Sequence, residues 1–222
     1  MRGAPALSYA RAMHLVWDWN GTLLDDFRLT AEATNAAFRT CSERVVDEEE
    51  LRRRFRRPIA EYYAEVLGQP VDAAEFARLD KVFHDTYHGR LGEVGLAAGA
   101  AEALAAWPGT QSLLSMWFHD QLVPFVDGFG LTPHFARIDG LRDRVGGGSK
   151  TDHLVRHLAA LGMSGGDCVL IGDTLDDAAA ARAVGADCVL VTGGFTDEER
   201  LRGTGFPVAP SLPAAVARAT RI

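Results

Sequence analysis

Four short apolar runs constrain the fold of this chain more than any other feature of its sequence. Each is followed by polar or glycine-containing residues and then by a helical pattern. The runs cover residues 13–17, 112–116, 168–171 and 187–191, and a weaker run covers residues 135–138. Short continuous apolar runs bounded by loops are typical of strands that a parallel sheet buries on both faces. The pattern predicts an α/β fold whose core is a doubly wound, Rossmann-like parallel sheet.

A block of helical patterns interrupts this alternation after the first run. No convincing strand lies among these patterns, which cover residues 29–41, 48–55, 59–67 and 73–87. Because the block separates the first predicted strand from the rest of the α/β pattern, we expect an inserted α-helical cap domain over residues 25–92. The core would then comprise residues 13–24 and 93–222, and residues 1–12 would form a loose tail.

The charge and composition of the chain argue against two classes of partner. Its net charge is −7 with histidine neutral, which opposes bulk attraction to nucleic acid or to an anionic membrane surface. No apolar run approaches the roughly 18 residues that a membrane helix needs. Cys41, Cys168 and Cys188 lack metal-site spacing, so we expect reduced thiols and a cytoplasmic location.

Polar side chains stand where the predicted strands end. Asp18 follows the first run, Ser115 lies at the tip of the second, and Asp173 lies just beyond the third. Lys150 follows a run of glycines. Ligands of a doubly wound sheet bind in the crevice beyond the carboxyl ends of its strands, so we expect these groups to meet in one site. The alternative for Asp18 alone is that it caps a turn, but turn capping does not predict the whole set.

In this arrangement the sequence resembles the haloacid dehalogenase superfamily of phosphohydrolases. The four motifs of that superfamily correspond here to Asp18-Trp19-Asn20-Gly21-Thr22, Ser115, Lys150 and Gly172-Asp173-Thr174-Leu175-Asp176-Asp177. The resemblance covers roughly residues 13–195, and its first and fourth motifs are the specific ones. The helical insert resembles the type I cap of the phosphoglycolate phosphatase and β-phosphoglucomutase branch.

The resemblance implies covalent catalysis by Asp18, whose carboxylate would attack phosphorus to form an aspartyl-phosphate. Lys150 and the Ser115 hydroxyl would neutralise charge on the transferring phosphoryl group. The same resemblance implies a Mg²⁺ ion held by the Asp18 and Asp173 carboxylates and by the backbone carbonyl of Asn20.

The acidic pair after Asp173 leaves one assignment open. The spacing of the family favours Asp177 as the acid that orients Lys150 or a metal-bound water, and Asp176 is the alternative.

The resemblance also implies a set of residues that contact the substrate. These are Gly21, Thr22, Ser115, Met116, Lys150, Arg56 and Arg57. The alternative for the two arginines, which precede a helix break at Pro58, is a solvated helix face.

The chain departs from the family pattern at Asn20. The usual motif has aspartate there, which protonates the leaving oxygen and later activates water. A carboxamide cannot transfer protons in this way. Three interpretations of Asn20 remain. The protein is a slow enzyme, an enzyme specialised for good leaving groups, or an enzyme in which another residue supplies the acid. His119 and Asp26 are the candidates for that residue.

The sequence therefore predicts a Mg²⁺-dependent phosphatase that hydrolyses a small phosphorylated metabolite, with phosphoglycolate-like esters as one case. A 2-haloacid dehalogenase is the alternative among enzymes, and the acidic fourth motif favours phosphate chemistry over it. A catalytically weak binding or regulatory protein is the alternative of another class. The sequence predicts no particular oligomeric state.

Overall fold

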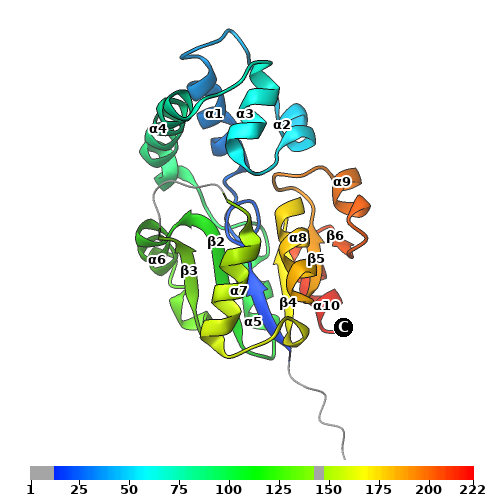
Figure 1. Ribbon diagram of the computed structural model, residues 1–222. Coiled ribbons are helices and arrows are strands. Elements are labelled where there is room, and N and C mark those ends of the chain that lie inside the picture. Colours follow the sequence, from blue (N-terminus) through cyan, green and yellow to red (C-terminus); the bar gives the residue numbers. More distant parts are fainter. Residues whose placement is uncertain (1–12, 143–147) are drawn as a thin grey trace, which may run out of the picture.

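A parallel sheet forms the core of the computed structural model, which describes residues 13–142 and 148–222 (Figure 1). The predicted tail at residues 1–12 lies outside these ranges. The described residues form a six-stranded sheet in the order β3-β2-β1-β4-β5-β6, with every neighbouring pair parallel. The strands are β1 (His14–Trp17), β2 (Gln111–Phe118), β3 (Ile138–Leu141), β4 (Cys168–Gly172), β5 (Asp187–Val191) and β6 (Val208–Ala209). The predicted α/β fold is confirmed.

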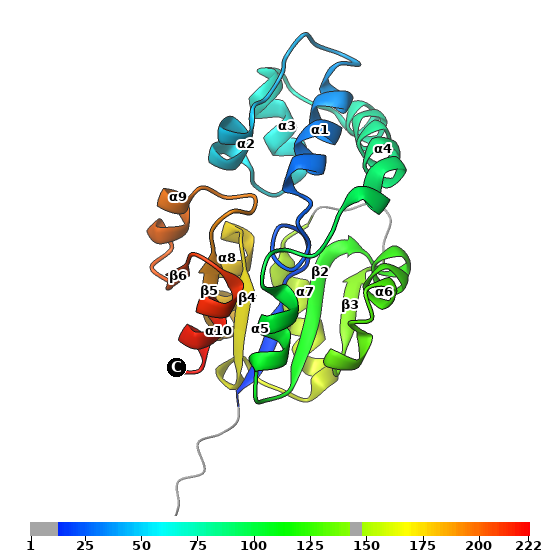
Figure 2. The same cartoon turned by 180° about the vertical axis from the view of Figure 1, so that it is seen from behind.

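Helices cover both faces of the sheet, as Figures 1 and 2 show from opposite sides. On one face lie α7 (Lys150–Leu161) and α8 (Leu175–Val184), and on the other lie α5 (Ala100–Ala106), α6 (His119–Gly128) and α10 (Leu212–Ala219). Side chains of a strand alternate between faces, so Leu15 and Trp17 pack with α5, α6 and α10 while Val16 packs with α7 and α8. This two-sided burial explains why the strands are continuous apolar runs.

Three strands differ from their sequence predictions. β2 continues two residues past Met116, so Ser115 lies inside the strand rather than at its tip. β3 begins at Ile138, where the weaker predicted run over residues 135–138 ends. This edge strand is only partly buried and contains polar Asp139, so its own residues form no continuous apolar run. β6 was not predicted, since a strand of two residues leaves no apolar run.

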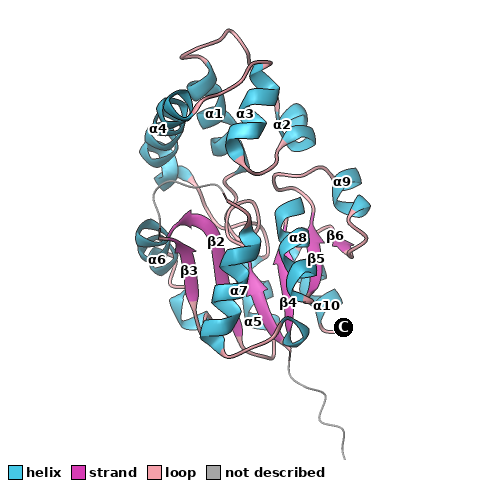
Figure 3. Cartoon of the chain, in the orientation of Figure 1, coloured by secondary structure: helices cyan, strands magenta, loops and turns pink. Residues whose placement is uncertain are grey.

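Four helices follow β1 and gather above the carboxyl ends of the strands, where Figure 3 shows helices and loops only. They are α1 (Phe27–Phe38), α2 (Glu48–Arg54), α3 (Ile59–Leu67) and α4 (Ala73–Arg90). Asp47 and Asp72 cap the amino ends of α2 and α4 through their side chains, and Gly68 ends α3 in the left-handed conformation. These helices bury a hydrophobic cluster of their own around Phe38, Leu51 and other apolar side chains.

The two linkers between these helices and the sheet pair with one another. The backbone N–H of Asp25 donates to the carbonyl of Gly95 at 3.0 Å, and that of Ala97 donates to the carbonyl of Leu23 at 2.9 Å. Phe195, from the loop after β5, adds a contact by packing between the α1–α4 helices at 5.6 Å from the Phe27 ring. The helices are therefore held over the strand ends by both backbone and side-chain contacts.

The remaining elements are α9 (Glu198–Gly203) and the short 3₁₀ helices η1 (Leu91–Glu93), η2 (Thr132–His134) and η3 (Gly165–Asp167). Across the described ranges, no helix has both the length and the apolar character needed to cross a membrane.

Candidate active site

A buried lysine joins two carboxylates at the carboxyl ends of the central strands. Lys150 is the first residue of α7 and is 2% exposed. Its Nζ donates to Oδ1 of Asp18 and to Oδ1 of Asp177, each at 2.5 Å. Burial disfavours the charged lysine, but the Asp177 and Asp18 carboxylates outweigh that cost and raise the pKa of Lys150. The side chain is therefore a fixed positive charge in contact with the predicted nucleophile.

Asp177, rather than Asp176, makes this contact because a capping box fixes its side chain. At the start of α8, the backbone N–H and the hydroxyl of Thr174 donate to Oδ2 of Asp177 at 3.0 and 2.6 Å. The other carboxylate oxygen of Asp177 is thereby turned toward Lys150. Asp176 instead accepts from the backbone N–H of Lys150 at 3.0 Å.

Asp173 is a third buried carboxylate and is enclosed by backbone on two sides. It accepts from the Thr22 hydroxyl at 2.7 Å and from the backbone N–H of Phe195 at 2.6 Å. A Cβ on Gly21, whose φ is +72°, would lie 2.7 Å from Oδ2 of Asp173, and a Cβ on Gly194 would lie 2.1 Å from the same atom. Only glycine leaves room for this carboxylate at both positions.

The three carboxylates form a site whose chemistry fits a divalent cation. Oxygens of Asp18, Asp173 and Asp177 all lie within 4.8 Å of one another. Burial raises the pKa of Asp18 to about 6, with Lys150 opposing the shift and Asp177 adding to it. Burial and the charge of Asp18 also raise the pKa of Asp173 well above its usual value. Lys150 balances only part of this negative charge, and carboxylate oxygens are the donors that Mg²⁺ prefers.

Asn20 lies at the centre of a second network, beside Asp18. Its Nδ2 donates to Oδ2 of Asp26 at 2.8 Å, and its Oδ1 accepts from the Ser115 hydroxyl at 3.2 Å. The Tyr87 hydroxyl also donates to Oδ2 of Asp26, at 2.7 Å, and the backbone N–H of Trp117 donates to Ser115 at 3.0 Å. Asn20 therefore links the predicted phosphate-binding serine to a buried carboxylate on the side of the α1–α4 helices.

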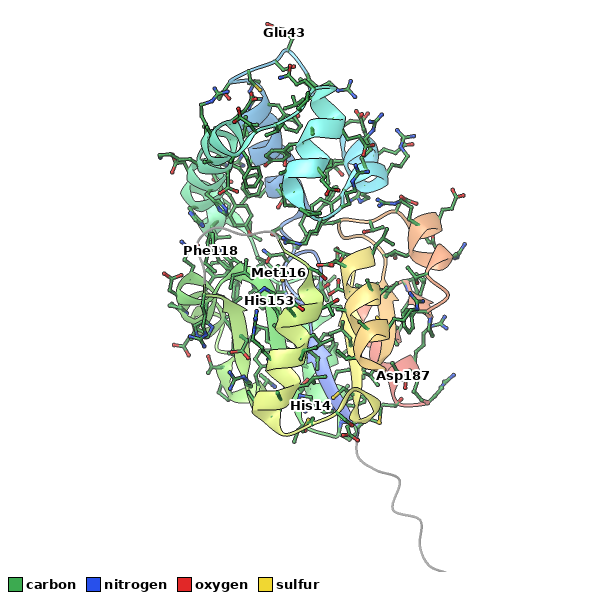
Figure 4. All side chains as sticks on the ribbon, viewed as in Figure 1. His14, Glu43, Met116, Phe118, His153 and Asp187 are labelled. Atoms are coloured by element: carbon green, nitrogen blue, oxygen red, sulfur yellow. The ribbon has the colours of Figure 1, made fainter. Side chains whose placement is uncertain are left out.

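A cavity of about 400 Å³ opens over Asp18 and extends between α1, α3 and α4. Six of the predicted site residues line it, namely Asp18, Asn20, Met116, Ser115, Lys150 and Arg57. Figure 4 shows Met116 and Phe118 where β2 meets the helices above the sheet, whereas His14 lies toward the opposite end. The cavity therefore lies beyond the carboxyl ends of the strands, where the polar residues that follow the strands predict a site.

Other predicted residues do not reach the wall of this cavity. Thr22 donates to Asp173 instead, and Gly21 lies against that carboxylate. Of the two arginines, Arg57 lines the cavity with its Nε 3.9 Å from Oδ2 of Asp176, whereas Arg56 forms an ion pair with Glu65. The structure thus brings one arginine to the site and directs its neighbour away.

The two candidates for a borrowed acid are also separated. Asp26 lines the cavity, whereas His119 does not. His119 instead accepts from the backbone N–H of Gly140 at 3.2 Å and lies 3.3 Å from the Arg142 guanidinium.

Three residues that the sequence analysis missed also contribute to the site. Gly194 and Phe195 support Asp173, and Tyr87 supports Asp26. The pair Gly193-Gly194 after the last predicted strand was an available signal, whereas nothing local marks Phe195 or Tyr87.

A family model, a sequence relative and several solved structures are similar to this chain. The HAD-hydrolase-like family model matches residues 147–217. A phosphoglycolate phosphatase of Mesorhizobium japonicum is 27% identical over 190 residues, which cover 82% of this chain and 84% of that protein.

Two solved structures share the fold. The structure of a predicted phosphatase from Clostridium acetobutylicum matches with a TM-score of 0.82 and 17% identity over 95% of this chain and 99% of its own. A haloacid dehalogenase-like hydrolase from Streptococcus pneumoniae matches with a TM-score of 0.81 and 16% identity, over 94% of this chain and 99% of its own.

Proposed function

Since this chain belongs to the haloacid dehalogenase superfamily of hydrolases, we propose that it is a Mg²⁺-dependent phosphatase that hydrolyses a phosphate monoester through an aspartyl-phosphate. The observation that carries the proposal is the contact of Lys150 with both Asp18 and Asp177 beside a third carboxylate, Asp173, at the base of a cavity. A buried nucleophile, a fixed cation and a cation-binding cluster together are what phosphoryl transfer to a carboxylate requires.

The reaction would have two displacements at phosphorus. In the first, a carboxylate oxygen of Asp18 forms a bond to phosphorus as the bond to the leaving alcohol oxygen breaks, and that oxygen takes a proton. In the second, water attacks the same phosphorus, the bond to Asp18 breaks, and phosphate leaves. Lys150, Ser115 and Arg57 would hold the phosphoryl oxygens through both steps, because all three line the cavity around Asp18.

Asp18, Asp173 and the backbone carbonyl of Asn20 would hold the Mg²⁺ ion, and Asp177 would keep Lys150 in place. When bound, the ion neutralises negative charge on the phosphoryl group and on the carboxylates. Asp173 is prepared for this task by its two hydrogen-bond donors, Thr22 and Phe195.

The proton for the leaving oxygen needs a source other than the Asn20 amide. Asp26 is a carboxyl group that lines the same cavity and contacts Asn20. Burial raises the pKa of Asp26, with hydrogen bonds from Asn20, Tyr87 and Gly21 opposing the shift, so this group can hold a proton at higher pH than an exposed aspartate. We assign the acid role to Asp26 within this proposal.

The name of the Mesorhizobium relative makes phosphoglycolate the first ester to assay. A 2-haloacid dehalogenase is less well supported, because attack on carbon gives no role to three clustered carboxylates. The thiols of Cys41 and Cys168 donate to the backbone carbonyls of Phe38 and Ser164, each at 3.4 Å. We place this activity in a reducing, cytoplasmic setting, where thiols persist.

The test is phosphate release from a panel of alkyl and aryl phosphates, with and without Mg²⁺, together with mass spectrometry of the protein trapped during turnover. We expect release that depends on Mg²⁺ and a phosphoryl adduct on Asp18. Asp18→Asn should abolish both signals, whereas the matched change Asp25→Asn, at an exposed carboxylate outside the cavity, should leave them intact. Turnover by Asp18→Asn, with deamidation excluded, would contradict the proposal.

A further inference from the structure

The cavity above Asp18 is larger and more apolar than a short hydroxy acid requires. We infer that the substrate is a phosphate monoester of an extended, uncharged apolar alcohol whose chain lies among the α1–α4 helices. The inference rests on the proposed function for the phosphate end, and it concerns the part of the cavity that the chemistry does not use.

The size of the cavity is the first observation. Its volume of about 400 Å³ falls within the range of pockets that enclose drug-sized ligands, roughly 300–1,000 Å³. Along α1 the wall reaches Thr34, and at about 1.5 Å per residue this position lies on the order of 10 Å beyond the start of the helix at Phe27. The cavity therefore continues far past the space that the phosphoryl group occupies.

The wall of this distal part is dominated by carbon. Its large side chains come from four directions, namely α3, α4, the end of α2 and the loop after β5. They are Ile59, Tyr62, Tyr63, Phe76, Phe83, Phe55 and Phe195. Several of these rings pack on one another, edge to face for Phe55 on Tyr62 at 5.9 Å and tilted for Phe55 on Phe195 at 5.1 Å between centroids. Rings held in this way form a preorganised apolar wall, which favours an apolar ligand by excluding water from its surface.

The charges on the wall are the second observation, because they oppose a carboxylate in the leaving group. Among the described lining residues the lysines and arginines are Lys150, Arg57 and Lys81. Lys150 and Arg57 lie at the phosphate end, beside carboxylates. Lys81 pairs with Asp85 at 2.6 Å, and its side chain is 73% exposed at the rim.

Carboxyl groups occupy the same wall on two sides. Asp26, assigned above as the acid, lies near the sheet, and Asp80 lies on α4, 3.5 Å from the His84 ring. An anionic leaving group such as glycolate would meet the carboxylate of Asp80 with no unpaired lysine or arginine at the described distal wall to balance it. The distal cavity therefore selects for an uncharged chain.

The experiment uses a series of straight-chain alkyl phosphates, whose leaving alcohols differ little in acidity, with Mg²⁺ present. From ethyl to octyl phosphate we expect kcat/KM to rise about fourfold per added methylene until the cavity is full, the fold-change that corresponds to about 0.8 kcal/mol per buried methylene. Phosphoglycolate should be hydrolysed at least about tenfold less efficiently than butyl phosphate.

Two variants place this effect in the cavity. Thr34→Phe, which narrows the distal part, should abolish the gain from the longer chains and leave ethyl phosphate unchanged, whereas Thr40→Phe, at an exposed position outside the cavity, should change neither. Should Thr34→Phe fold poorly, Ala77→Asp at the exposed rim should lower the octyl value several-fold, with Ala74→Asp as its control one turn away.

Binding of alkylphosphonates, measured by calorimetry, separates this inference from the proposed function. Short phosphates hydrolysed with no gain from chain length, or a preference for phosphoglycolate, would overturn the inference and leave the phosphatase standing. No hydrolysis of any ester, with phosphonate affinity still rising with chain length, would overturn the phosphatase and support the apolar cavity. No hydrolysis and no rise in affinity would overturn both.

Discussion

The side-chain amide of Asn20 donates a hydrogen bond to the carboxylate of Asp26, with 2.8 Å between Nδ2 and Oδ2. The same carboxylate accepts from the backbone N–H of Gly21 at 2.7 Å through its other oxygen. Asn20 therefore occupies the position where related enzymes carry an acid, and its amide contacts an acid, Asp26. This arrangement moves the carboxyl group one side chain away from the reacting centre while leaving it on the wall of the cavity.

Asn20→Asp should accelerate hydrolysis of alkyl phosphates within the roughly 10²–10⁴-fold range of general acid–base catalysis. The new carboxyl group would lie against Asp26, and two carboxylates at this distance share a proton, which supplies the acid that the first step needs. Burst kinetics would measure formation and hydrolysis of the aspartyl-phosphate separately. Aryl phosphates, whose leaving groups need little protonation, should gain less in the first step.

The double variant Asn20→Asp with Asp26→Asn is the matched control for that experiment, since it exchanges the two groups and keeps the charge. It should be active, whereas Asp26→Asn alone should slow alkyl phosphates more than aryl phosphates. If Asp26→Asn slows both classes equally, Asp26 positions Asn20 rather than supplying the proton.

Gly194→Ala should weaken Mg²⁺ binding by about 10- to 100-fold, the range found when a group that supports a metal ligand is disturbed. The added Cβ would lie 2.1 Å from Oδ2 of Asp173, so the carboxylate must move. Isothermal titration calorimetry measures the affinity directly. Gly203→Ala, where a Cβ meets no described atom within 4 Å, is the control. Equal Mg²⁺ affinities in the two variants would remove Asp173 from the metal site.

Arg57→Ala should lower kcat/KM by about 10- to 100-fold, since a hydrogen bond to a charged group contributes about 1.5–3 kcal/mol. Arg56→Ala should have little effect, because Arg56 pairs with Glu65 away from the cavity. Steady-state kinetics on one alkyl phosphate compares the two variants. Equal effects of the two substitutions would contradict the assignment of Arg57 to the phosphoryl group.

The contribution of His14 to the stability of the fold should decrease as the pH falls from about 6.5 to about 4. Burial, with a smaller effect of His157, lowers the pKa of His14 from 6.5 to about 4, and Ser112 lies between the two rings at 2.8 and 2.7 Å. In this window the unfolded chain binds a proton that the folded chain does not, so protonation favours unfolding. The loss for His14 is at most about 1.4 kcal/mol per pH unit.

Urea unfolding at several pH values checks this prediction. Relative to the unsubstituted protein, His14→Gln should gain unfolding free energy as the pH falls from 6.5 to 4, whereas His134→Gln, at an exposed histidine, should not. An unchanged pH dependence in His14→Gln would contradict the prediction.

The sequence by itself determined the layers of the fold and the groups at the strand ends. Apolar runs at regular intervals are sufficient to predict a buried parallel sheet, because each residue of such a strand faces one of two covered surfaces. Once the sheet is predicted, Asp18 and Asp173 must lie at its carboxyl edge. The helical patterns between residues 25 and 92 were also local enough to be seen, since caps such as Asp47 and Asp72 mark their starts.

Tertiary structure decided which neighbours in the sequence act at the site. Asp176 and Asp177 are adjacent, and only the rotation of α8, fixed by Thr174, turns Asp177 toward Lys150. Arg56 and Arg57 are separated in the same way by the loop between α2 and α3. Because such choices depend on contacts between residues far apart in the chain, local patterns do not contain them.

The apolar cavity is the largest feature that sequence reasoning did not anticipate. Its wall combines Thr34, Phe76 and Phe195, which come from three separate segments and each look like ordinary core residues in the sequence. A cavity exists where packing leaves space between elements, and that space depends on how α1 and α4 are placed over the sheet. The sequence therefore specifies the reacting groups, whereas the placement of the helices above them specifies the room for a substrate.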